Sequence, residues 1–269
     1  MTTSRSPASR ISRAGRWWRG LAGLAAVVTI SQILAVTGVV PREFLPTAAD
    51  VLARAARLAA DPVFLVNVAA TVRAWATGVA LAVAVGVPVG LLLGSIPAFG
   101  TAVRPVLEFL RPIPSVALIP LVSLILGAGL TTEVTLVVYA AVWPVLFNAV
   151  YGLQDADPIP RETLRVFGFG RLEVLWRVSL PAAAPFIATG IRLAAAIGLI
   201  LAVGTEILAG FGDGLGVVIA QAQQAPDGTT DVLAGMVWAG ALGLVINALL
   251  AGGERRLFRW HSSQSGDGR

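Results

Sequence analysis

The segment Arg161–Pro181, RETLRVFGFGRLEVLWRVSLP, is a charged insert in a chain that is otherwise rich in alanine, valine and leucine. It contains four arginines and two glutamates. Gly168 and Gly170 favour a break between two short helices, because glycine readily adopts the left-handed conformation that ends a helix. Glu173 and Arg177 stand four residues apart, which allows an ion pair on one helix face. On these residues alone, the insert fits either a docking surface for a soluble protein or an ordinary solvated loop with helical character.

The composition of the chain is that of an integral membrane protein. Of its 269 residues, 56% are hydrophobic and 13% are charged, and the mean hydropathy is +0.80. Soluble domains carry about 25% charged residues. The net charge is +5, and every basic residue is an arginine. Because these arginines are spread among apolar segments, they fit membrane topology and contact with lipid, and no nucleic-acid partner is expected.

Several residue types that carry chemistry are absent from the sequence or rare in it. The chain has no cysteine, which excludes a disulfide, a thiolate metal site and a cysteine nucleophile. Its single histidine, His261, excludes an HExxH zinc site. It has no lysine, so it cannot form an ordinary P-loop, and any ATP that drives it must be bound by a partner subunit. We therefore predict no catalytic site, no metal and no cofactor in this chain, and a membrane enzyme is disfavoured.

Six apolar segments predict an all-α, polytopic bundle of about six transmembrane helices. They lie at about residues 21–40, 66–93, 113–126, 134–150, 182–208 and 232–251. The first segment follows five arginines, a pattern that is also typical of a signal peptide. Its length, however, exceeds that of a signal-peptide core and favours an uncleaved helix. The third contains Pro114 and Pro120, which are typical both of a simple kink and of a span that lines a solute pathway.

The segments between the spans complete the predicted organisation, and Pro181 is expected to end the insert and open the fifth span. The predicted parts begin with a basic arm at 1–19, which is followed at 20–65 by the first span and an external interfacial segment with an amphipathic helix at 48–60. The core is predicted at 66–260, and it includes polar connections at 95–112 and 210–230 and the insert at 161–181. A disordered tail is predicted at 261–269.

Four glycines of the second span fall on one helix face, at four- or eight-residue spacing. They are Gly78, Gly86, Gly90 and Gly94. Small residues on one face let two helices approach closely in lipid, so we predict that this face packs against another helix.

The distribution of arginines predicts the orientation of the chain. An even number of spans places both termini on the same side of the membrane. If that side is the cytoplasm, the arm, the connection at 95–112, the insert and the C-terminal tail lie there, and together they hold fifteen of the twenty arginines. Basic residues concentrate in cytoplasmic segments, so both termini and the insert are predicted to be cytoplasmic.

Two charged residues lie inside the fifth apolar segment. Arg192 and Glu206 are fourteen residues apart, close to four helical turns, so they share a face but cannot pair with each other. Charges inside a membrane are costly and often functional, which makes both of them candidates for the pathway or a gate. The alternative for each is a structural ion pair with another helix. Arg73, near the outer end of the second span, is expected to reach toward the membrane surface.

The spacing of the insert resembles a known family signature. Glu162-Thr163-Leu164 is followed after three residues by Gly168, and after nine more by Val178-Ser179-Leu180-Pro181. This resembles the EAA signature of permease subunits in binding-protein-dependent ABC importers, with Thr163 and Leu164 in place of two alanines. Further segments are similar to the nitrate, sulfonate and taurine branch of these permeases: 110–121, 190–194, 206–208, 214–216 and 254–260.

The resemblance implies a role for the insert. In that family the corresponding segment is the coupling helix, which docks on the ATP-binding subunit. Glu162 would then pair with a basic residue of the ATPase or cap the short helix, and Gly168 would permit the sharp turn. The implied docking residues are Glu162, Thr163, Leu164, Arg165, Gly168, Phe169 and Gly170.

The resemblance also implies partners, a location and a class of solute. The fold would be that of a type I ABC importer permease in the bacterial inner membrane, working with two ATPase subunits, an extracytoplasmic solute-binding protein and a second permease copy, most simply as a homodimer. The solute would be a small anion such as nitrate, a sulfonate or taurine, with a pyrimidine vitamin precursor as the alternative. An ion-gradient-driven secondary transporter or a channel is the rival function, but it would not need the patterned insert.

Overall fold

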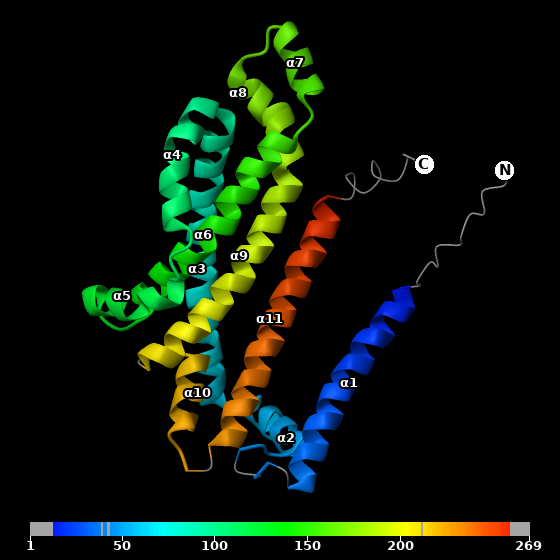
Figure 1. Ribbon diagram of the computed structural model, residues 1–269, viewed down its shortest axis with the longest axis vertical. Coiled ribbons are helices and arrows are strands. Elements are labelled where there is room, and N and C mark those ends of the chain that lie inside the picture. The colour runs from blue at the N-terminus through cyan, green and yellow to red at the C-terminus, as the bar shows by residue number, and fades with distance from the viewer. Residues whose placement is uncertain (1–12, 39, 42–43, 211, 227, 259–269) are drawn as a thin grey trace, which may run out of the picture.

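A bundle of helices makes up the part of the chain that the computed structural model describes, namely residues 13–38, 40–41, 44–210, 212–226 and 228–258. No strand occurs within these ranges (Figure 1), so the predicted all-α class is confirmed. The elements, in chain order, are α1 (Arg13–Thr37), α2 (Ala48–Leu58), α3 (Pro62–Ser95), α4 (Pro97–Leu110), the 3₁₀ turn η1 (Ser115–Leu118), α5 (Ile119–Leu126), α6 (Leu130–Asp155), α7 (Pro158–Val166), α8 (Arg171–Val174), the π-turn η2 (Leu175–Ser179), α9 (Leu180–Ala209), α10 (Leu215–Gln223) and α11 (Thr229–Leu257).

The number of membrane-spanning helices agrees with the prediction of about six only approximately. Four helical stretches are long and apolar enough to cross a membrane alone: Pro62–Ser95, Leu130–Asp155, Arg171–Ala209 and Thr229–Leu257. A fifth crossing is possible if α4 and η1–α5, which meet at a bend of 73°, count as one broken span. The apolar part of α1, Ala25–Thr37, lies where the first span was predicted but is shorter than the other spans.

The centre of the bundle is formed by α3, α6 and α9, with α6 packed against both of the others. All four glycines on the predicted face of α3 point at α6. A Cβ built on Gly90 would lie 2.6 Å from the carbonyl oxygen of Leu146, and one built on Gly78 would lie 2.5 Å from a methyl carbon of Val137. No side chain fits at such distances, so the predicted packing role of these glycines is confirmed.

The same contacts give the direction of each helix. Gly78 faces Val137 and Gly94 faces Leu153, so α3 and α6 run parallel. Gly198, late in α9, also lies against Val137, early in α6, so α9 runs antiparallel to both. The short helices α7 and α8, which connect α6 to α9, therefore lie at one end of the bundle, while α2 and α10 lie at the other end (Figure 1).

The polar connection predicted at 95–112 and the separate span predicted at 113–126 are both wrong. Residues 97–110 form α4, whose charged pair Arg104 and Glu108 stands one turn apart on the helix with 2.7 Å between nitrogen and oxygen. Pro114 precedes η1 and Pro120 lies in the first turn of α5, and the chain turns through 73° between α4 and these two elements. The prolines mark the break in a bent pair rather than a kink in one straight helix.

Two further boundaries differ from prediction. Pro181 does not end the insert, because α8 continues through η2 into α9 as a single 39-residue helix. In the π-turn, Leu180 donates its N–H to the carbonyl of Leu175, five residues back, and the wider turn keeps the chain helical just before a proline that has no N–H to donate. The connection predicted at 210–230 contains the nine-residue helix α10. Residues 1–12 and 259–269 lie outside the described part, and residues 13–19 of the predicted arm belong to α1.

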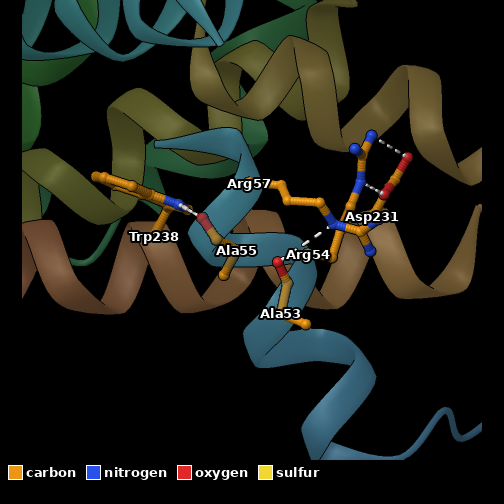
Figure 2. Close-up of polar contacts among 6 residues, drawn as sticks. All are labelled: Ala53, Arg54, Ala55, Arg57, Asp231 and Trp238. Atoms are coloured by element: carbon orange, nitrogen blue, oxygen red, sulfur yellow. Dashed lines mark hydrogen bonds and ion pairs between the residues drawn. The ribbon is translucent and has the colours of Figure 1, made fainter. Parts of the chain in front are cut away.

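The amphipathic helix predicted at 48–60 is present as α2, and it is fastened to α11. Its position on the external side of the membrane stays a prediction. Arg54 of α2 forms a hydrogen-bonded ion pair with Asp231 in the first turn of α11 (Figure 2). The hydrogen bond to Asp231 raises the pKa of Arg54, so this guanidinium stays charged. The indole N–H of Trp238 donates to the carbonyl of Ala55 over 3.0 Å, and its ring packs edge-on against Phe64 of α3 at 5.5 Å. The link holds α2, α3 and α11 together at the end remote from α7 and α8.

The glycine contact between α3 and α6 can be tested with one methyl group. Gly90→Ala would push a Cβ into the carbonyl of Leu146, and overpacking of this kind costs about 1–3 kcal/mol. We expect a lower midpoint of thermal unfolding, followed by tryptophan fluorescence of the detergent-solubilised protein. Gly240→Ala in α11 is the matched control, since its Cβ meets no atom within 4 Å. Equal midpoints for the two variants would contradict the close-packing role.

Candidate functional site

The short helices α7 and α8 form a turn-linked pair that lies beyond the ends of α4 and α11 (Figure 1). Asp157 starts α7 by accepting a hydrogen bond from the N–H of Ile159 at 2.9 Å. Gly168 has φ of +84°, and its N–H donates to the carbonyl of Arg165 at 3.0 Å. This left-handed residue ends α7 and sets the angle at which α8 leaves, as glycine at this position in the sequence predicts.

The surface of this pair and of the adjoining turns includes several exposed apolar side chains. Five large hydrophobic side chains on α7, α8 and the adjoining turns are more than two-thirds exposed: Ile159, Val166, Phe167, Leu172 and Trp176. Clustered exposed apolar side chains mark a surface that contacts another protein or a membrane. Val166, at 86% exposed, and Phe167, at 76%, were not singled out from the sequence. The sequence could have indicated them, because both are bulky apolar residues that stand directly before Gly168, the glycine that ends the helix.

The residues implied as docking residues all lie on this pair. Most are exposed, whereas Leu164 and Phe169 are half-buried. Glu162 does not cap α7, because that role belongs to Asp157; its carboxylate is exposed and makes no ion pair among the described residues. Thr163 donates its hydroxyl to the carbonyl of Ile159, inside α7. Exposure of Glu162, Thr163, Arg165, Gly168 and Gly170 is compatible with docking, which stays a prediction.

Local contacts hold the pair rigid. The ion pair predicted between Glu173 and Arg177 is present at 3.6 Å, and the other carboxylate oxygen of Glu173 accepts the N–H of Gly170 at 3.3 Å. The guanidinium of Arg177 also lies over the ring of Phe169, 5.1 Å from its centroid. At the start of the pair, Arg161 donates to the carbonyl of Leu153 in α6. The turn is thus fixed both to α6 and to the start of the long helix that contains α9.

At the opposite end of the bundle, Glu206 fastens the start of α10. Glu206 is 4% exposed; one carboxylate oxygen accepts the hydroxyl of Thr71 and the other accepts the N–H of Gly216, both at 2.7 Å. Thr71 in turn accepts the N–H of Leu215 at 2.8 Å, and a Cβ on Gly216 would lie 2.6 Å from that of Glu206. A single carboxylate therefore joins α3, α9 and α10, and its partners are neutral donors rather than the opposite charge of an ion pair.

A cavity of about 220 Å³ adjoins this network and is rich in acidic groups. We call it the glutamate pocket; its charged lining residues are Arg73, Glu133, Glu206 and Asp213. Glu133, in the first turn of α6, is 8% exposed, its Oε1 has no hydrogen-bond partner among the described residues, and its carboxyl interacts with that of Glu206. The sequence reasoning did not single out Glu133, although an acid at the start of an apolar span was a visible signal.

A larger cavity, of about 390 Å³, lies where α4 bends into η1. We call it the bend pocket, and its polar and aromatic lining residues include Arg111, Ser115, Tyr139, Trp143, Phe147 and Asn148. Trp143 stands at the middle of α6, and the lining residues of α9 lie near the middle of that helix. This pocket is therefore at mid-span, whereas the glutamate pocket lies between the first turn of α6 and the last turn of α9. None of the described residues that line the bend pocket is acidic.

The remaining pathway candidates lie outside both cavities. Arg192 pairs with Glu254 of α11 at 3.1 Å, which fits the structural ion pair considered as its alternative role. Pro114 and Pro120 flank η1 at the bend without lining either pocket. Of the four candidates, only Glu206 lines one of these cavities. The pathway roles of all four stay predictions.

Comparison with known proteins gives the family. The family described as binding-protein-dependent transport system inner membrane component matches residues 86–259, which include α7 and α8. The chain belongs to this family. The permease is thus a helical, multi-pass inner-membrane component of a transport system, and it is not an enzyme.

Individual relatives of the permease cover most of its length. It is 29% identical over 243 residues to the taurine transport system permease protein of Escherichia coli, which covers 88% of each chain. It is 29% identical over 250 residues to a putative aliphatic sulfonates transport permease protein of Bacillus subtilis, covering 93% of this chain and 90% of the relative. It is 28% identical over 184 residues to the nitrate import permease protein of Leptolyngbya laminosa, covering 68% and 65%. The resemblance to the nitrate, sulfonate and taurine branch is confirmed.

The Glu206 network predicts local order at the start of α10. Glu206→Ala would leave the Gly216 N–H without its acceptor, and the Thr71 hydroxyl with only its longer hydrogen bond, to the carbonyl of Asn67; a buried unpaired group costs about 1–3 kcal/mol. We expect amide exchange over residues 214–220, measured by mass spectrometry, to rise by at least about tenfold. Thr71→Val should act alike, because it removes the acceptor of Leu215. Glu254→Ala is the control, because it breaks the ion pair with Arg192, away from α10. Unchanged exchange in the Glu206 and Thr71 variants, or an equal rise in the control, would contradict the role of Glu206 in holding α10.

Proposed function

We propose that this chain is the membrane permease of an ABC importer for a small anion. In this proposal the pair α7–α8 docks on a separate ATP-binding subunit that holds the ATP, and a soluble binding protein delivers the solute at the opposite end of the bundle. Two copies of the chain form the pathway. In the same proposal α7, α8 and both termini lie in the cytoplasm, as the distribution of arginines predicts.

The observation that carries the proposal is the exposed apolar surface of α7–α8. Phe167 and Val166 stand at the tip of the pair, directly before Gly168, and are among the most exposed large side chains of the described residues. Both residues precede the long helix that starts at Arg171, and in the proposed orientation they face the cytoplasm. A partner that covers them gains the free energy of their burial, about 1.5–3 kcal/mol for each fully buried large side chain.

The connection behind α8 supports a coupling role. α8 leads through η2 into α9 without a break, and the 39 residues from Arg171 to Ala209 extend for roughly 58 Å at 1.5 Å per residue. A displacement imposed on α8 therefore reaches the far end of α9, where Glu206 holds α10, through one helix rather than through a flexible loop. Coupling requires that the contacts between the permease and the ATP-binding subunit differ between two conformational states. A continuous helix transmits the movement of α8 to the spans.

The names of the relatives support an anionic solute. The relatives are described as permeases for taurine, aliphatic sulfonates, nitrate and bicarbonate. These solutes share an anionic group on a small body. A small oxyanion, with an organosulfonate as its leading example, is the solute class proposed for this chain, and a pyrimidine vitamin precursor is the alternative.

One observation favours a second candidate, an ion-gradient-driven transporter. Glu133 and Glu206 are buried acids that lie near each other inside spans, as in proteins that carry protons or cations across membranes. The two candidates differ in their energy source. Uptake into proteoliposomes that contain the permease, its ATP-binding subunit and its binding protein should require ATP and should survive a protonophore. Uptake by the permease alone, driven by a proton or sodium gradient, would favour the second candidate.

The turn at Gly168 provides a specific test of docking. At φ of +84° an alanine is strained by about 1–2 kcal/mol, which is roughly tenfold in an equilibrium, although a Cβ there would meet no atom within 4 Å. We expect Gly168→Ala to weaken retention of the ATP-binding subunit during purification and to lower ATP-dependent uptake by about tenfold. Gly38→Ala is the control, because it carries similar strain at φ of +71°, also in open space, at the end of α1.

The apolar tip provides an independent test that does not strain the backbone. Phe167 is 76% exposed, so Phe167→Ser should leave the thermal unfolding midpoint of the permease unchanged. If the tip is buried by the ATP-binding subunit, the variant should bind that subunit at least about tenfold more weakly in a pull-down titration. If the folded Phe167→Ser and Gly168→Ala variants bind the ATP-binding subunit as strongly as the unsubstituted chain does, the docking role of α7–α8 is contradicted.

A further inference from the structure

The two cavities on α6 and α9 differ in their charged lining residues. The glutamate pocket is lined by three acidic residues and one arginine, whereas the bend pocket is lined by Arg111 and no acid. The only charged group among the described residues that line the bend pocket is therefore positive, and it attracts an anion. The bend pocket is also the larger of the two and lies at mid-span, beside a break in the helical backbone. Broken helices at mid-span often form solute sites in transporters, because their backbone can turn toward a cavity.

Arg111 provides a positive charge that no carboxylate neutralises. The described ion pairs involve Arg54, Arg104, Arg177 and Arg192, and Arg111 is in none of them. Its guanidinium instead lies over the ring of Phe147, 4.8 Å from the centroid. A contact with a ring face orients the planar group and leaves its edge N–H groups available to an oxyanion, which guanidinium binds through two parallel hydrogen bonds.

Two further donors line the same cavity. The indole Nε1 of Trp143 is buried and has no hydrogen-bond partner among the described residues. A buried N–H without an acceptor is costly, so the site is more stable when an acceptor occupies it. The hydroxyl of Ser115, at the start of η1, also lines the pocket. Together with Arg111, these groups offer N–H and O–H donors and no carboxylate.

The aromatic walls of the pocket are held in place before any solute arrives. Tyr139 donates its hydroxyl to the carbonyl of Leu110 at 3.0 Å, which ties α6 to the end of α4. Its ring packs edge-on against Trp143 at 5.9 Å, and Phe147 stacks on Tyr151 at 6.1 Å. These four aromatic residues follow one another at every fourth position of α6 and so form one stripe. Their rings offer an apolar surface to the carbon body of a small solute.

We propose that the bend pocket is a binding site for a small organic sulfonate inside the permease, with Arg111, Trp143 and Ser115 holding the sulfonate oxygens and the aromatic stripe of α6 contacting the carbon chain. The inference rests on the proposed importer function and names where its solute binds within the membrane. It makes the bend between α4 and η1 part of the site, because that bend brings Arg111 and Ser115 to face Trp143.

The absence of cysteine from the natural chain makes the charge of the pocket measurable. Ser115→Cys introduces one thiol into the bend pocket of the full-length permease, studied in its complex with the ATP-binding subunit. Two methanethiosulfonate reagents of similar size serve as probes, one carrying a 2-sulfonatoethyl group and one a 2-(trimethylammonio)ethyl group. The measured quantity is the ratio of the anionic to the cationic labelling rate, divided by the same ratio for free cysteine.

We expect this normalised ratio to exceed one, and Arg111→Gln in the same background to lower it by about tenfold, because a unit charge a few ångströms from the reacting thiol is lost. Ethanesulfonate at millimolar concentration should slow labelling by the anionic reagent, whereas sodium chloride of equal ionic strength should not. Arg104→Gln is the matched control: this arginine lies on α4, is exposed and pairs with Glu108, and its loss should leave the ratio unchanged.

Several outcomes would overturn the proposal. They are a normalised ratio below one, an equal effect of the two arginine variants, no protection by ethanesulfonate, or a thiol that reacts with neither reagent because a second copy of the chain covers it. None of these results depends on ATP-driven uptake, which tests the importer function separately. A complex with normal uptake and an Arg111-independent ratio would therefore reject the bend pocket and keep the proposed function.

Discussion

The close approach of α3 and α6 is the constraint on which the rest of the structure depends. In lipid, helices gain little by hiding apolar side chains from a solvent that is equally apolar, so association relies on packing at short range. Gly78 and Gly90 remove the side chains that would keep the two backbones apart, and Val137 and the carbonyl of Leu146 fill the space. With these helices fixed and parallel, α9 packs antiparallel along α6, and both cavities form on that shared frame.

The parts that could be predicted from the sequence are those with a local, periodic signal. Long apolar runs predicted the spans, the spacing of the glycines predicted the packed face of α3, and the pattern around Gly168 predicted a turn between two short helices. The ion pair of Glu173 with Arg177 was also predictable, since both partners lie on one helix. In contrast, the partner of Arg192 could be expected to be an acid on another helix, but its identity as Glu254 required the arrangement of α9 beside α11.

The parts that could not be predicted depend on contacts between distant segments. The charged residues of α4, Arg104 and Glu108, led to the prediction of a polar connection. The sequence of this segment does not reveal which surroundings these two side chains face, so its helix could not be recognised as part of a bent pair. The helix α10 starts at Gly214 and Leu215 because Thr71 and Glu206, far away in the sequence, accept N–H groups there. Similarly, Pro181 was expected to end a helix, and the π-turn before it absorbs the missing hydrogen bond instead.

Glu206 and Arg111 differ in what their polar atoms contact, and this difference separates a structural role from a role in transport. Glu206 has both carboxyl oxygens hydrogen-bonded within the protein, to Thr71 and to Gly216, so this side chain holds α10 and its oxygens are not available to a passing solute. Arg111 is satisfied only by the face of an aromatic ring, which leaves its N–H edge unoccupied. An anion at mid-span would complete the coordination of Arg111 without breaking any contact that holds the bundle together. A site of that kind can bind and release solute while α3, α6 and α9 keep their packing, which is what a permease requires.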